Sequence, residues 1–176
     1  MALIFPITSL ELRLLEETPA NDNMILATAH ELSQHLKPNA RLMGLDVGEK
    51  TIGLALSDVL RTIASPLETI DRKTFTKDME RMAQIIQTHN IGGLVIGYPI
   101  NMNGTEGPRC QSIRQFARNV AEKHPVPLVL WDERMSTMAV ERTMIEAGMT
   151  RQKRDLVVDK LAASYILQSF LDTQKT

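Results

Sequence analysis

Apolar and polar positions change their pattern at about residue 41. From there, short apolar runs at about 41–47, 51–57, 61–70, 93–97 and 127–131 alternate with helical periodicity at about 74–89, 108–123, 137–147 and 150–172. The turn signal after the first run predicts that the first two strands pair as an antiparallel hairpin. The whole order predicts a mixed five-stranded α/β sheet with helices on both faces, in which strands one, four and five are parallel.

The first 40 residues follow a different pattern. They predict a short helix before residue 18 and a second helix capped by Asn21 or Asp22, with Ile25, Leu32 and Leu36 on one face. No group of chemically reactive side chains stands out in this segment. We therefore expect a helical extension over residues 1–40 and one domain over residues 41–176.

Asp46 is the most informative residue of the first strand. It lies within an apolar run and opens the pattern Asp46-x-Gly48-x-x-x-x-Gly53. A buried carboxylate without a partner loses its hydration with little return, so we expect a metal ion or a phosphate beside it. Asp132 and Glu133 directly follow the last apolar run, at the sheet edge where the Asp46 strand also ends.

Asp159 supports the same interpretation from the final helix. At about 100° per residue it lies in the middle of the apolar stripe formed by Leu156, Ala163, Ile166 and Phe170, which faces the sheet. Asp155, by contrast, lies in the first turn, where the helix dipole alone favours an acid. We expect a functional role for Asp159 and treat Asp155 as a weaker candidate.

Asp46, Glu133 and Asp159 together predict a divalent-metal site. Strand side chains alternate, so only one of Asp132 and Glu133 should face the site; we choose Glu133 and keep Asp132 as the alternative. Carboxylate oxygens suit Mg²⁺ or Mn²⁺, and such sites typically hydrolyse phosphodiesters with two ions about 4 Å apart when substrate is bound. The fourth strand supplies no acid.

Basic and amide side chains near the same edge are candidate phosphate contacts. A solvated surface is the equally weighted alternative for them, and the net charge of −1 does not by itself indicate a nucleic-acid partner. Aromatic residues are only 4% of the chain, so phosphate recognition should dominate over base stacking. The predicted substrate-binding residues are Asn101, Arg109, Arg134, Arg151, Lys153, Arg154 and Lys160.

Composition narrows the setting. Cys110 is the single cysteine, which excludes an intrachain disulfide and favours a reducing cytoplasm. No apolar run approaches the roughly 20 residues that a membrane helix needs. We therefore expect a cytoplasmic protein with no membrane partner, present as a monomer or a homodimer.

Four motifs in order resemble the YqgF (RuvX) family. They are Gly44-Leu45-Asp46-Val47-Gly48-x-Lys50-x-Ile52-Gly53, Gly97-x-Pro99-x-Asn101-Met102-x-Gly104-Thr105-Glu106-Gly107, Trp131-Asp132-Glu133-Arg134-x-Ser136-Thr137 and Val158-Asp159-Lys160-x-Ala162-Ala163, within about residues 41–172.

The resemblance implies a ribonuclease H-like fold similar to the Holliday-junction resolvase RuvC. It also implies a hydrolase of ribosome biogenesis, because nuclease action at the 5′ end of the small-subunit ribosomal RNA precursor is ascribed to the family. By position its acidic site falls on Asp46, Glu133 (or Asp132) and Asp159. Two departures are Thr51, where many members have Arg, and Asp155, which interrupts an often all-basic run.

Three functions therefore stand beside one another. The first is a metal-dependent endonuclease acting on structured RNA, or on branched DNA as a junction resolvase. The second is a catalytically silent RNA-binding assembly factor, which the acid-free fourth strand keeps open. The third is nucleotide binding of the actin-like kind, since Asp-x-Gly at a hairpin also holds ATP phosphates, although two such domains are needed there.

Overall fold

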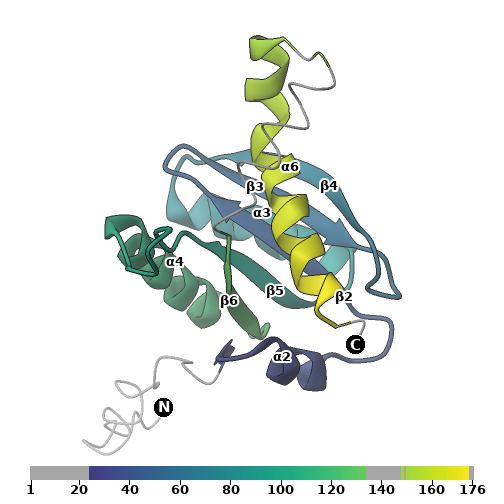
Figure 1. Ribbon diagram of the computed structural model, residues 1–176. Helices are drawn as coiled ribbons and strands as arrows, with labels where there is room; N and C mark the ends of the chain where they lie inside the picture. Colours follow the sequence, from purple (N-terminus) through teal and green to yellow (C-terminus); the bar gives the residue numbers. More distant parts are fainter. Residues whose placement is uncertain (1–23, 134–147, 149, 175–176) are drawn as a thin grey trace, which may run out of the picture.

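The computed structural model describes residues 24–133, 148 and 150–174, and gives side chains for all of these except 151–156. Six strands form one sheet in the order β1-β6-β5-β2-β3-β4 (Figure 1). Their bounds are β1 Ile25–Leu26, β2 Arg41–Val47, β3 Thr51–Ser57, β4 Ala64–Asp71, β5 Ile91–Tyr98 and β6 Leu128–Asp132. The predicted mixed α/β sheet is confirmed.

The pairing directions also follow the prediction. β2, β3 and β4 form an antiparallel meander, whereas β2, β5 and β6 run parallel. The predicted number of five strands was wrong by one, because β1 adds a parallel pair to β6 through Ile25 and Leu26. A two-residue strand is too short to show the alternation by which strands are recognised in a sequence.

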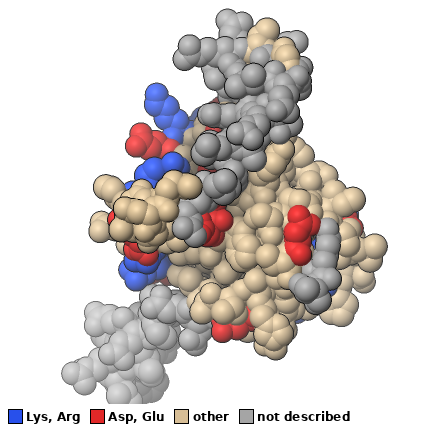
Figure 2. All heavy atoms as spheres, viewed as in Figure 1, with Lys and Arg blue, Asp and Glu red and all other residues tan. Residues whose placement is uncertain are grey.

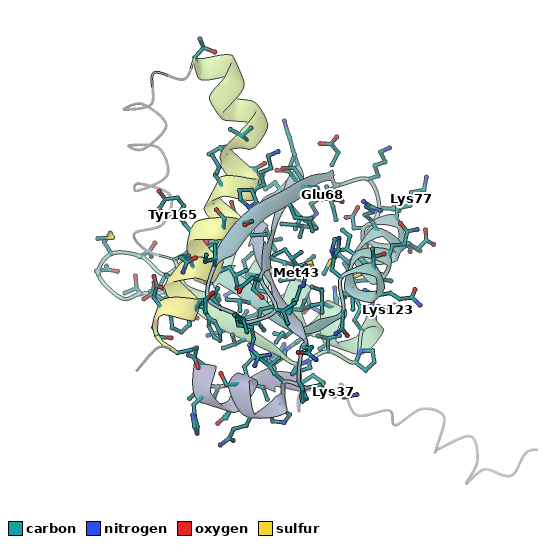
Figure 3. All side chains as sticks on the ribbon, turned by 90° about the vertical axis from the view of Figure 1, so that its right-hand side faces the viewer. Lys37, Met43, Glu68, Lys77, Lys123 and Tyr165 are labelled. Atoms are coloured by element: carbon teal, nitrogen blue, oxygen red, sulfur yellow. The ribbon has the colours of Figure 1, made fainter. Side chains whose placement is uncertain are left out.

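Helices cover both faces of the sheet. α3 (Phe75–Thr88) and α4 (Pro108–Lys123) lie on one face, and α6 (Arg151–Asp172) crosses the other (Figures 1 and 3). The short α2 (Ala29–His35) packs at the opposite end of the parallel strands from the candidate site, with Leu32 fully buried. Among the described residues, no helix combines the length and the apolar character that a membrane crossing requires. The helix expected over 137–147 falls outside the described residues.

Helix starts follow their capping residues. The Thr74 hydroxyl accepts a hydrogen bond from the backbone N–H of Lys77 at 3.4 Å and so begins α3. The Thr28 hydroxyl plays the same part for α2, accepting from the N–H of Glu31 at 3.2 Å. The second N-terminal helix therefore starts later than predicted, and Ile25 belongs to a strand rather than to that helix.

Small residues let α6 lie directly on the sheet. A Cβ added to Gly44 of β2 would come within 2.7 Å of the Leu167 Cβ and 2.8 Å of the Ala163 carbonyl oxygen. Ala163, Ile166 and Phe170, the stripe that the sequence predicts to face the sheet, are each fully buried. The close approach brings the middle of α6 over β2 and β3, where the candidate site lies.

Candidate active site

Two glycines flank Asp46 and make room for the other acids. Gly53 of β3 pairs directly with Asp46 of β2. A Cβ at Gly53 would fall on the backbone carbonyl of Asp159, so only glycine allows the backbone of α6 to lie this close to β3. Gly53 thus places Asp159 beside Asp46, although 113 positions separate the two acids in the chain.

Gly97 is the glycine that makes room for Glu133. Gly97 of β5 follows Ile96, which pairs with Leu45, so it lies on the other side of Asp46. A Cβ at Gly97 would collide with the Glu133 carboxylate. The backbone N–H of Glu133 donates to the Tyr98 carbonyl oxygen at 3.3 Å, which holds the residue after β6 against β5. Glu133 therefore lies on the sheet next to Asp46.

The electrostatics agree with this grouping. Burial, and then the negative charge of Asp159, raise the pKa of Asp46 to about 6, while Arg109 opposes the rise. Burial, and then the charge of Asp46, raise the pKa of Glu133 to about 7, again opposed by Arg109. Asp46 thus interacts with both other acids, and a cation placed there would relieve the cost of keeping them ionised.

Thr51 fixes the Asp159 carboxylate. Its hydroxyl donates a hydrogen bond to Oδ2 of Asp159 at 2.7 Å, from the first residue of β3 to the third turn of α6. The backbone N–H of Gly48 donates to the Thr51 carbonyl oxygen at 2.8 Å and closes the hairpin turn. Thr51 therefore orients an acid of the candidate site.

Arg109 is a cation that acts on two of the acids. It lies in the first turn of α4, and its Nη2 donates to the carbonyl oxygen of Val47, the residue after Asp46, at 3.5 Å. It acts on the pKa of both Asp46 and Glu133. Its role as a phosphate contact stays a prediction; the structure shows an exposed guanidinium beside Asp46 and Glu133.

The structure describes the side chains of some of the remaining predicted residues and not those of others. Asn101 lies in the exposed loop before α4, where its side chain donates to the Thr105 hydroxyl at 3.0 Å. Lys160 is half-buried, next to Asp159, and Asp132 is exposed at the end of β6. Arg134 lies outside the described residues. At the start of α6 the structure describes the backbone, but not the side chains, of Arg151, Lys153, Arg154 and Asp155. On the face shown in Figure 2, basic and acidic side chains alternate along the edge beside α4.

The donor set suits a hard divalent cation, since it consists of carboxylate oxygens. No three acidic, histidine or cysteine side chains in the described part of the chain stand close enough to hold an ion as they lie. The Thr51 hydroxyl donates to one carboxylate oxygen of Asp159, and the second oxygen is the one that a cation would bind. Asp46 lies between the other two acids and interacts electrostatically with both, with Glu133 on the β5 side and Asp159 on the β3 side.

Sequence reasoning missed the role of Thr51 and of the two glycines. Thr51 had no signal of its own, because its partner is 108 positions away. Gly97 follows the apolar residues Val95 and Ile96 inside β5, and a glycine within a strand was the available signal for a close approach.

The fold is that of the RuvC and ribonuclease H-like proteins. The solved structure of T. thermophilus RuvC in complex with a Holliday junction substrate matches it with a TM-score of 0.50 at 16% identity, over 78% of this chain and 97% of that one. The chain belongs to the RuvX family, described as Holliday junction resolvase, whose model matches residues 40–173.

Curated relatives agree with the nuclease character of this family. One from Paramagnetospirillum magneticum is 55% identical over 150 residues, covering 85% of this chain and 96% of the relative. One from Ruegeria pomeroyi is 50% identical over 149 residues, covering 85% and 97%. Both carry the name "Putative pre-16S rRNA nuclease".

Proposed function

We propose that this protein is a metal-dependent endonuclease that matures the 5′ end of the small-subunit ribosomal RNA precursor in the cytoplasm. The observation that carries the proposal is the convergence of Asp46, Glu133 and Asp159 over two glycines, beside Arg109. Family membership and the names of the relatives support the substrate.

Each residue has a distinct part in the proposed reaction. Asp46, Glu133 and Asp159 would hold Mg²⁺ or Mn²⁺, and the bound ion would supply charge neutralisation at the scissile phosphate and activation of the attacking water. Thr51 keeps the Asp159 carboxylate turned toward the hairpin. Arg109 draws the phosphate toward the acids and offsets part of their mutual repulsion. The raised pKa of Glu133 would also let it accept a proton near neutral pH whenever no ion holds it.

Branched DNA is the second candidate substrate. The family description and the RuvC complex favour it over other DNA forms. The chain would then cut the same bond type with the same carboxylates, so only the shape of the nucleic acid distinguishes the two functions.

The test is cleavage by the purified full chain. A ribosomal RNA precursor and a four-way DNA junction are each incubated with Mg²⁺ or Mn²⁺, and the products are mapped to the nucleotide. We expect cleavage of the RNA near its mature 5′ end by the wild type, and losses of at least about a hundredfold in Asp46→Asn, Glu133→Gln and Asp159→Asn.

Glu122→Gln is the matched control, because Glu122 is an exposed acid near the far end of α4. Cutting of the junction alone would move the assignment to the resolvase. Absence of cutting, with wild type and acid variants binding RNA equally, would replace the nuclease by an RNA-binding assembly factor.

A further inference from the structure

A cleft of about 520 Å³ opens between α3 and α4. These two helices lie on the face of the sheet opposite α6 (Figures 1 and 3). Its volume is in the range of roughly 300–1,000 Å³ that is usual for small-molecule sites. Val47 and Gly48, which directly follow Asp46, form one wall, and Arg109 belongs to the rim. The cleft therefore begins where the candidate active site ends, with Arg109 shared between them.

The rim of the cleft is basic. Arg72 and Lys73 precede α3 and face Arg109 of α4 across the opening. Asp78 is buried, lies 3.7 Å from the Arg72 guanidinium and accepts the backbone N–H of Lys73, so it mainly anchors the wall. Glu49 is the exposed acid of the lining. Neither the Lys73 ammonium nor the Arg109 guanidinium makes an ion pair with the described residues. Arg109 donates to the Val47 carbonyl oxygen and interacts with the charges of Asp46 and Glu133, so Lys73 is the freer of the two cations for an anion.

The floor of the cleft is apolar and aromatic. Phe75, Ile113 and Phe116 line it, and the Arg72 guanidinium lies 5.7 Å from the centre of the Phe116 ring. Thr74 and Ser112 add exposed hydroxyls at the starts of the two helices. Cations and hydroxyls around an aromatic floor are the side-chain set that binds a phosphate together with a base.

Arg72 makes this wall rigid. Its Nη1 donates to the Gly48 carbonyl oxygen at 2.6 Å, and its backbone N–H donates to the Lys50 carbonyl oxygen at 2.8 Å. It therefore fastens the turn after Asp46 to the helical face while its side chain still lines the cleft. A ligand in the cleft would contact the same turn that carries the candidate active site.

We propose that this cleft binds an unpaired nucleotide of the strand whose phosphodiester is cut. Lys73 and Arg109 hold its phosphate, and its base lies against the half-buried Phe75, beside the Arg72 guanidinium that covers the buried Phe116 ring. The proposal rests on the proposed nuclease function for the identity of that strand. It goes further by assigning a single-stranded flank to the substrate, on the side of the sheet that α6 does not cover.

The experiment measures binding without cleavage. The full chain, in EDTA, is titrated into a fluorescent single-stranded oligoribonucleotide and into two RNA duplexes, one blunt and one with an unpaired overhang. We expect the wild type to bind the overhang duplex more tightly than the blunt one. Lys73→Glu and Ser112→Glu should weaken binding of the overhang and the single strand by about tenfold, with blunt-duplex affinity unchanged.

Two further variants sharpen the result. Lys123→Glu makes the same charge change at the far end of α4 (labelled in Figure 3) and should shift every affinity by less than about twofold. Lys73→Ala should lower the slope of log affinity against log salt by about one, as expected for one lost phosphate contact. Thermal unfolding midpoints equal to that of the wild type show that the variants are folded.

The outcomes separate this proposal from the nuclease function. Unchanged overhang binding in both Lys73→Glu and Ser112→Glu overturns the proposal that the cleft binds an unpaired nucleotide, even where the wild type cuts RNA. Loss of overhang binding in these variants supports the cleft, even where the wild type cuts nothing. An equal loss in Lys123→Glu overturns it too, because general charge would then explain the effect.

Discussion

The Thr51 hydroxyl donates a 2.7 Å hydrogen bond to Oδ2 of Asp159 and so joins the first hairpin to the last helix. Within the described residues it is the one hydrogen bond of the Asp159 side chain, and it orients that carboxylate toward the hairpin. Thr51 therefore acts on the candidate site by positioning an acid.

Thr51→Val should lower the cleavage rate by about tenfold, because a hydrogen bond to a charged group is worth about 1.5 kcal/mol or more. Metal titration of the cleavage rate should shift to higher concentration, which a change in overall stability alone would not cause. Thr51→Ser should restore most of the rate. Thr76→Val, at an exposed position of α3, serves as the control, and equal rates in Thr51→Val and Thr76→Val would refute the positioning role.

Gly53→Ala should destabilise the fold by about 2 kcal/mol, because the new methyl group would fall on the Asp159 carbonyl and push α6 off the hairpin. Urea unfolding measures the loss. Gly107→Ser is the contrasting variant: a Cβ there is 3.7 Å from its nearest neighbours, and a hydroxyl at this N-cap should leave stability unchanged or slightly higher. Equal stability of Gly53→Ala and the wild type would contradict the described contact.

Asp46→Asn should stabilise the metal-free protein while removing its activity. The folded-state pKa of Asp46, about 6, lies above its ordinary value of 3.8, so the folded state binds more protons and stability falls as pH rises between these values. Above about pH 6 the cost is fully present, and is on the order of 3 kcal/mol.

Urea unfolding in EDTA at pH 5 and pH 8 tests this sign. The stability gain of Asp46→Asn over the wild type should be larger at pH 8, and Asp71→Asn, at an exposed position of β4, should show no such gain. Added Mg²⁺ or Mn²⁺ should raise the stability of the wild type more than that of Asp46→Asn, since a ligand stabilises the state that binds it. A gain that shrinks at pH 8 would contradict the burial of this carboxylate.

Asp58→Ala should loosen the β3–β4 connection. The Asp58 carboxylate accepts hydrogen bonds from the N–H of Thr62 at 2.6 Å and of Ile63 at 2.9 Å, and the Ile63 bond is the main cause of its lowered pKa. Amide exchange at Thr62 and Ile63 should speed up in the variant. In the wild type the protection should be present above about pH 4 and lost as pH falls through the lowered pKa. Unchanged exchange would refute the contribution of these bonds.

The sequence predicts the parts of the site that follow from periodicity and motif order. Asp46 stood out as an acid in an apolar strand, and Asp159 as an acid in an apolar helical stripe, since both patterns are local. Thr51 and Gly97 could not be predicted in the same way, because their roles depend on contacts with Asp159 and Glu133 from distant parts of the chain. The first strand escaped prediction for a related reason, since its pairing with Leu128 and Val129 defines it rather than its own two residues.

β1 also matters for solubility. It covers β6 at Leu128 and Val129, two buried apolar positions on a strand that would otherwise end the sheet. An uncovered apolar strand offers unpaired backbone groups to other chains and invites self-association. A chain shortened to residues 41–176 would keep every acid of the candidate site and yet expose this edge, so we expect it to aggregate where the full chain stays dispersed.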